Sequence, residues 1–148
     1  MEKTYNIFDR PEHEEQCAVF TWAKIYENLY PDLKYMFAIP NGGMRPKTTA
    51  TKQGETVIYS IEAAKLKKEG VKPGVPDVMF PSPRGAYHGL FIEMKRRQGG
   101  VIRKSQKQWL RGLAKQGYYS VACEGSTAAI RVLERYLSLM ENERILDW

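Results

Sequence analysis

The sequence predicts an α/β fold in which a small mixed β-sheet is flanked by α-helices. Segments with helical periodicity alternate with short apolar segments typical of strands, and Pro- or Gly-containing breakers separate them. The order that results is helix, strand, helix, strand, strand, helix, strand, helix. Near the C-terminus, a strand–helix–strand unit predicts two parallel strands with a right-handed crossover, and the hairpin before it adds an antiparallel strand. These features favour a sandwich of sheet and helices.

The first half of the chain alternates between helix and strand. Apolar residues recur at helical spacing through 13–30, which predicts the first helix. Residues 35–39 form a short apolar run that the breaker at 40–43 ends, so they predict a buried strand. Residues 44–57 are polar, basic and Thr-rich, and we expect a surface loop there. A second helix is expected over 59–69, with a glycine placed to end it.

The second half contains the hairpin and the parallel unit. Residues 78–80 and 90–95 predict the two strands of the hairpin. The next helix is expected over 105–116, with its first residue, a serine, as the N-cap. Residues 118–123 predict the last strand, and a final helix with one apolar face is expected over 126–140.

The composition is that of a globular domain. The chain has 148 residues, of which 43% are hydrophobic and 27% charged, and this excludes disordered and fibrous classes. We expect one domain over residues 1–148. No apolar run approaches the ~18 residues of a membrane span, and the N-terminus has no apolar signal core. A cytoplasmic location is therefore expected.

The charge indicates the kind of partner. Lys and Arg exceed Asp and Glu, which gives a formal net charge of +6. Such a balance is typical of proteins that bind nucleic acid, a membrane surface or an acidic protein. The alternative is that the charge serves only solubility. Charge alone does not decide between these possibilities.

Cysteine and histidine limit the metal chemistry. The two cysteines, Cys17 and Cys123, are too few for a disulfide framework or a zinc site, and we expect both to be buried free thiols. The two histidines, His13 and His88, are also too few for a histidine-rich site. A metal ion in this protein would therefore be bound mainly by carboxylates.

Three residues suggest where chemistry takes place. Asp77 follows a stiff turn where a strand begins, and alone it would be interpreted as a turn aspartate. Glu93 and Lys95 are two residues apart in an apolar strand, so they share a face, as a simple ion pair would also do. The predicted hairpin brings all three side chains to one end of the sheet. Two carboxylates with carbonyl or water oxygens suit Mg²⁺ or Mn²⁺, which can polarise a phosphodiester and activate water.

These residues also carry a resemblance to a known family. Gly74-Val75-Pro76-Asp77 followed by Ile92-Glu93-Met94-Lys95 resembles the PD-(D/E)XK nuclease signature. With Pro40-Asn41-Gly42-Gly43 and with Gln106 at the start of the next helix, the chain is similar to VRR-NUC nucleases of the stand-alone phage type. The resemblance spans about residues 12–137, which we take as the core of the domain.

The resemblance implies a fold, an activity and a set of site residues. The fold would be a restriction-endonuclease-like core, and the activity a Mg²⁺- or Mn²⁺-dependent endodeoxyribonuclease. Asp77, Glu93 and the backbone carbonyl of Met94 would bind the metal. Lys95 would be the catalytic lysine, and Gln106 would face the site from the following helix.

The resemblance also implies an acid on the first helix and a branched substrate. The acid maps best to Glu15, as a catalytic residue and metal ligand, while Glu12 and Glu14 stay open as alternatives. Stand-alone viral members are homodimers that cut four-way (Holliday) junctions, whereas the domain in larger repair proteins cuts flaps as a monomer. Because no second domain is evident in this chain, we expect a homodimer that cuts branched DNA in a phage-infected or bacterial cell.

Basic residues on both sides of the predicted site are candidate DNA contacts. Each of them is equally compatible with a solvated, charged loop. The basic candidates are Arg45, Lys47, Arg96, Arg97 and Lys104. Uncharged Asn41 is a further candidate, although a role in forming the turn is slightly favoured for it. Residues 45–65 look longer than in compact members, which suggests an altered substrate loop or dimer contact.

Other functions stay open at this point. The chain is also compatible with a flap or duplex nuclease of the same family, with a non-catalytic, basic nucleic-acid-binding module, or with an interaction protein that dimerises through its last helix. The joint presence of Asp77, Glu93 and Lys95 argues against a decayed site.

Overall fold

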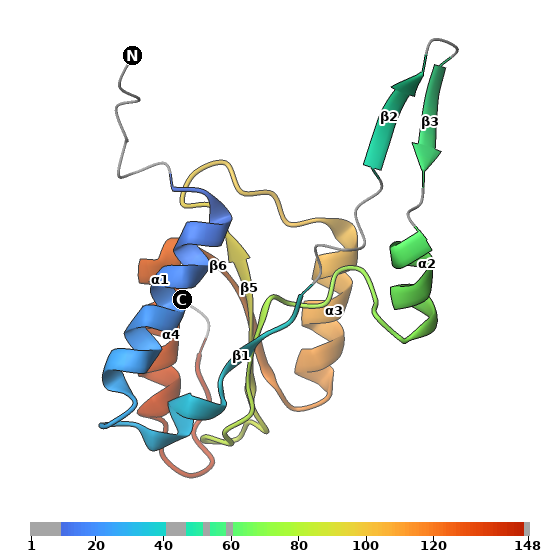
Figure 1. Ribbon diagram of the computed structural model, residues 1–148. Helices are drawn as coiled ribbons and strands as arrows, with labels where there is room; N and C mark the ends of the chain where they lie inside the picture. Colours follow the sequence, from blue (N-terminus) through green and yellow to red (C-terminus); the bar gives the residue numbers. More distant parts are fainter. Residues whose placement is uncertain (1–9, 41–46, 52–53, 59–60, 147–148) are drawn as a thin grey trace, which may run out of the picture.

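The computed structural model describes residues 10–40, 47–51, 54–58 and 61–146. For 47–51, 54–58 and Glu62 it describes only the backbone. It confirms the predicted α/β class. A mixed sheet of four strands in the order β1-β4-β5-β6 is flanked by helices (Figure 1). The four strands are β1 (Phe37–Ala38), β4 (Val78–Phe80), β5 (Leu90–Lys95) and β6 (Tyr119–Glu124).

Helices cover both faces of this sheet. Helices α1 (Glu12–Tyr26) and α4 (Gly125–Leu137) lie together on one face, and α3 (Lys104–Lys115) lies on the other (Figure 1). As predicted, β4 and β5 pair antiparallel, and β5 and β6 pair parallel with α3 as their crossover. Because β4 and β5 run in opposite directions, the residue before β4 and the last residues of β5 lie at one end of the sheet.

The core holds β5 in the middle of the molecule. Leu90, Ile92 and Met94 on β5 are fully buried, as are Phe80 on β4 and Leu133 on α4. A strand covered on both faces is expected to be almost continuously apolar. Each such side chain contributes about 1.5–3 kcal/mol by its burial. The polar residues at the end of β5 are therefore placed by a rigid strand.

The stretch at 44–57, predicted as a loop, is largely a β-hairpin. Strands β2 (Lys47–Thr51) and β3 (Gly54–Ile58) pair antiparallel, with Thr48 opposite Val57. The hairpin projects from the body, and helix α2 (Ile61–Lys68) follows it (Figure 1). The prediction treated polarity as a sign of a loop, but β-branched Thr and Val favour strands whatever their polarity.

Several predicted boundaries also need correction. The first helix ends at Tyr26, and a 3₁₀ helix, η1 (Pro31–Tyr35), reduces the strand that follows to two residues. Helix α3 begins at Lys104, with Arg103 and not Ser105 at the N-cap position. The reason is that the Gln106 side chain accepts the backbone N–H of Arg103 at 2.8 Å, which satisfies one of the unpaired amides of the first turn.

Two further predictions concern the burial of the cysteines and membrane-spanning helices. Cys123 is a buried thiol as predicted, but Cys17 is exposed, so the prediction for Cys17 was wrong. Within the described ranges, no helix has the length and apolar character needed to span a bilayer.

Candidate active site

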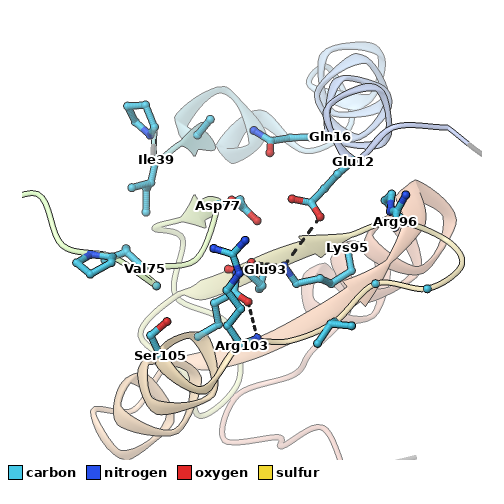
Figure 2. A pocket seen from close by; sticks show the side chains of 18 residues that line it. Glu12, Gln16, Ile39, Val75, Asp77, Glu93, Lys95, Arg96, Arg103 and Ser105 are labelled. Atoms are coloured by element: carbon cyan, nitrogen blue, oxygen red, sulfur yellow. Dashed lines mark hydrogen bonds and ion pairs between the residues drawn. The ribbon is translucent and has the colours of Figure 1, made fainter. Parts of the chain in front are cut away.

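A cleft of about 720 Å³ lies at the end of the sheet where β5 ends (Figure 2). Its walls come from α1, the turn before β4, the end of β5 and the start of α3. The structure brings four of the predicted catalytic residues together here: Asp77, Glu93, Lys95 and Gln106. The antiparallel pairing of β4 with β5 accounts for this convergence.

Asp77 is held by the backbone of the strand that carries Glu93. Its Oδ2 accepts the backbone N–H of Met94 at 2.8 Å. The turn before Asp77 requires Gly74, which has φ +85° and whose Cβ, if present, would lie 2.9 Å from Ser105. Burial raises the pKa of Asp77, while the Met94 N–H opposes that shift. The glycine thus allows the turn to lie against α3 and present the carboxylate to the cleft.

Glu93 is almost completely buried, with 1% of its surface exposed. Its Oε1 accepts hydrogen bonds from Lys95 Nζ at 2.7 Å and from the Gln106 amide. Its Oε2 is buried and has no hydrogen-bond partner among the residues that the structure describes. Burial raises the pKa of Glu93 to about 7, and the negative charge of Asp77 adds to this, although Lys95 opposes both. The carboxylate is therefore short of positive or donating partners when it is ionised.

Lys95 is the buried cation of the site, with 5% of its surface exposed. Its ammonium lies 2.7 Å from Glu93 Oε1 and 3.9 Å from Glu12 Oε2. A buried ammonium is costly unless anions compensate it. The two glutamates, one from β5 and one from α1, supply that compensation and point Lys95 toward the cleft (Figure 2).

The Gln106 amide has one orientation that satisfies both of its ends. Its Nε2 donates to Glu93 Oε1, while its Oε1 accepts the N–H of Arg103. A glutamine at the third position of a helix often accepts such a bond. Gln106 therefore ties the start of α3 to Glu93.

Of the acids on the first helix, Glu12 and not Glu15 lines the cleft. Glu15 is fully buried elsewhere, where its Oε2 accepts the backbone N–H of Ser126 at 2.7 Å and its Oε1 lies 3.6 Å from Arg97 Nε. Burial acts to raise the pKa of Glu15, but Ser126 and Arg97 outweigh it and lower the pKa. Glu15 therefore does not face the cleft, contrary to its prediction as the acid nearest the metal.

The predicted DNA contacts fall into three groups. Arg96 lines the cleft, and Lys104 is exposed at the start of α3. Arg97 does not line the cleft; its Nε lies 3.6 Å from Glu15 Oε1, and its contact with DNA stays a prediction. Asn41 and Arg45 lie outside the described residues, and the side chain of Lys47, the first residue of β2, is not described.

The sequence interpretation missed one wall of the cleft. Gln16 lines it beside Glu12 (Figure 2). The two residues are four apart on α1, so they share a helix face, and that spacing is a signal present in the sequence. Arg103 also lines the cleft, from the loop that precedes α3.

The donor set fits a hard divalent cation. In the part of the chain that the structure describes, no three His, Cys, Asp or Glu residues gather in a metal-binding group. Asp77 and Glu93, however, offer two carboxylates at one point, and Glu93 Oε2 is buried without a partner. Mg²⁺ is commonly bound by one or two carboxylates together with water or substrate phosphates. The residues present are compatible with such an ion.

Comparisons with known proteins gave two findings. The family model described as "VRR-NUC domain" matches residues 24–127, which is more than half of the chain. A solved structure described as "VRR_NUC domain protein" is similar over 91% of this chain and 96% of that one, with 31% sequence identity and a TM-score of 0.69. The search of curated proteins gave no match.

Proposed function

Because the chain belongs to the VRR-NUC family and is a DNA-binding nuclease domain, we propose that it is a metal-dependent, structure-selective endonuclease that hydrolyses phosphodiester bonds in DNA. The observation that carries the proposal is the buried, unpartnered oxygen of Glu93, next to Asp77 and Lys95. A buried carboxylate oxygen without a donor is costly unless a cation or a proton occupies it. In this family, divalent metal ions are in general use.

In this proposal, Asp77, Glu93 and the carbonyl of Met94 would hold Mg²⁺ or Mn²⁺. When bound, the ion would polarise the phosphodiester and lower the pKa of a water molecule. Asp77 is held in place by the Met94 N–H, so both carboxylates depend on the same segment of β5. Gln106 fixes Glu93 from the other side. These contacts pre-organise the ligands before an ion arrives.

Lys95 and Glu12 complete the proposed catalytic group. The ammonium of Lys95 lies in the cleft between two carboxylates, where it can orient the attacking water and neutralise charge that develops on the phosphate. Glu12 takes the place assigned to the acid of the first helix. Its carboxylate, 3.9 Å from Lys95 Nζ, can orient that ammonium or a water molecule beside it.

The substrate and assembly belong to the same proposal. We propose that the protein acts on four-way junctions or other branched DNA as a homodimer, which is what the sequence resemblance implies. Two copies of one site are needed to cut two strands symmetrically. Arg96 and Arg103, at the edge of the cleft, would contact phosphates next to the cleaved bond.

The test uses labelled DNA of matched sequence. The purified protein is incubated with a four-way junction, a flap and a plain duplex, each with Mg²⁺, Mn²⁺ or EDTA. Metal-dependent paired nicks at the junction alone are expected. Cleavage of flaps or duplexes would retain the chemistry and replace the proposed substrate. Binding without cleavage under any metal would contradict the proposal and favour a non-catalytic DNA-binding module.

A further inference from the structure

Helix α3 has two faces with different roles. One face contacts the sheet and carries Gln106, whose amide donates to Glu93. The opposite face carries Lys104, Lys107, Arg111 and Lys115, and all four side chains are exposed. We call these four residues the basic ridge. They lie three or four positions apart, so they form one stripe along the helix.

The basic ridge has no negative charge to balance it. Helix α3 contains no Asp or Glu. Among the described residues, no carboxylate lies within ion-pair distance of Lys104, Lys107, Arg111 or Lys115. Like charges four residues apart destabilise a helix by about 0.2–0.5 kcal/mol per pair. Lys107 and Arg111 form one such pair, and Arg111 and Lys115 form another. A stripe that costs stability and lacks counter-charges is suited to an anionic partner.

The position of the ridge relative to the active site is fixed. Trp109 Nε1 donates to the carbonyl of Pro73 at 3.0 Å, and Gly74 lies against Ser105. The turn that carries Asp77 is therefore attached to α3 at two points. Because Gln106 also joins α3 to Glu93, the ridge and the two carboxylates belong to one rigid unit.

The ridge also continues from the cleft. Arg103, which lines the cleft, is followed directly by Lys104, the first residue of the ridge. From Lys104 to Lys115 the helix rises about 16 Å at 1.5 Å per residue. Duplex DNA advances 3.4 Å per nucleotide of one strand, so the ridge matches about five nucleotides. A strand that passes through the cleft would find further cationic groups along α3.

We propose that the basic ridge binds the sugar–phosphate backbone of a duplex arm beyond the cleaved bond. The inference rests on the proposed nuclease function and adds to it a second, sequence-independent binding surface outside the cleft. Phosphate contacts of this kind set the register of a protein on DNA without reading its bases. The ridge would thus set how far from the arm's end or branch point the bond is cut.

The test compares two triple variants with the same change in charge. The first, K107Q/R111Q/K115Q, neutralises the ridge and keeps residues that favour helix. The control, K24Q/K34Q/R131Q, neutralises three exposed residues on α1, η1 and α4. Binding of a labelled duplex is measured by fluorescence anisotropy in EDTA, where metal-dependent cleavage does not occur, over a series of salt concentrations.

The expected result is a difference in salt dependence. The plot of log K against log salt has a negative slope, and each lost phosphate contact makes it less steep by about 0.9. The slope of the ridge variant should therefore be about 2–3 smaller in magnitude than that of the wild type. The control should keep the wild-type slope. Equal losses in both variants would show a general effect of charge and would overturn the inference, as would an unchanged slope in the ridge variant.

A charge-preserving variant guards against misfolding. K107R/R111K/K115R keeps all three charges, and it should restore the wild-type slope if the ridge acts through charge. Loss of binding in this variant as well would contradict a phosphate track. This test is separate from the test of nuclease activity. If the wild-type protein bound DNA but never cleaved it, the binding measurements would still show whether the ridge contributes to DNA binding.

Discussion

Two fully buried glutamates, Glu15 on α1 and Glu93 on β5, have pKa values shifted in opposite directions. Glu15 and Glu93 expose 0% and 1% of their surfaces, and each lies near a basic side chain. The pKa of Glu15 is nevertheless lowered, because hydrogen bonding from Ser126 and the charge of Arg97 overcome the effect of burial. The pKa of Glu93 is raised to about 7 by burial, which Lys95 does not overcome.

The difference lies in which oxygens have a hydrogen-bond donor or a cation beside them. Glu15 Oε2 accepts a backbone N–H at the N-terminus of α4, where the helix dipole favours an anion. Its Oε1 accepts no hydrogen bond among the described residues, but Arg97 Nε lies 3.6 Å from it. Both donors of Glu93 converge on Oε1, and Oε2 is left without one. Burial by itself does not mark a catalytic carboxylate. A buried oxygen with neither a hydrogen bond nor an ion-pair contact of its own among the described residues, next to a second carboxylate, is the better indicator.

The contrast between the two glutamates is tested most strongly by neutralising each of them in turn. We expect Glu93→Gln to reduce cleavage by about a thousandfold or more, because a metal ion supplies several kcal/mol of transition-state stabilisation at about 1.4 kcal/mol per tenfold. Glu15→Gln, in folded protein, should cleave within a few-fold of wild type. Nicking rates in Mg²⁺ measure both. Equal losses in the two variants would contradict the division of roles.

Glu15, which we expect to have little effect on cleavage, should matter for the free energy of unfolding. Glu15→Ala removes the acceptor of the Ser126 N–H and the partner of Arg97, so we expect a loss of about 1.5–3 kcal/mol in the free energy of unfolding. Because the folded pKa of Glu15 is lowered, its contribution is present above the unfolded pKa and is lost as the pH falls through the folded value. Urea denaturation at pH 7 and pH 3 measures it. A loss that is the same at both pH values would indicate packing and not charge.

The raised pKa of Glu93 predicts pH-dependent metal binding. The folded state keeps a proton on Glu93 up to about pH 7, whereas its ordinary pKa is 4.5. The stability from that proton is present below 4.5 and is lost as the pH rises through about 7. Mn²⁺ competes with the same proton, so its affinity should be about tenfold lower at pH 6 than above pH 8. Calorimetric titration checks this, and pH-independent affinity would argue against Glu93 as the ligand.

The smallest expected effect is at Gln106. Gln106→Ala removes the acceptor of the Arg103 N–H, and we expect a loss of about 0.5–1 kcal/mol in the free energy of unfolding. Gln106→Glu keeps that acceptor but places a second carboxylate against Glu93, which should raise the pKa of Glu93 further. Thermal unfolding and Mn²⁺ titration distinguish the two variants. Equal metal affinity in both would show that the amide does not influence Glu93.

Much of the site could be predicted from local patterns. Strand periodicity placed Glu93 and Lys95 on one face, and the hairpin brought Asp77 to the same end of the sheet, as the structure shows. Both inferences need only the geometry of neighbouring strands. The VRR-NUC resemblance, carried by the segments at 74–77 and 92–95, is confirmed by the family match.

The errors arose where the outcome depends on distant packing. Glu12 and Glu15 are three residues apart on α1. Only the packing of α1 against α4 decides which of the two faces the cleft. The contacts of Arg97 with Glu15 and with Thr127 likewise depend on the start of α4, which begins 28 residues later in the chain. The hairpin at 47–58 was missed because a polar composition was given more weight than the β propensity of threonine.

The unequal burial of the two thiols gives the native chain a built-in chemical probe. Cys17 is exposed on α1, whereas Cys123 is buried in β6, directly opposite Met94 of β5, and burial raises its pKa to about 12. Because thiolate is the reactive form, a maleimide should attach to Cys17 in the folded protein and to Cys123 only when the central strands separate. The rate of the second labelling would therefore report how often the strand that carries Glu93 opens, and whether Mn²⁺ or DNA keeps it closed.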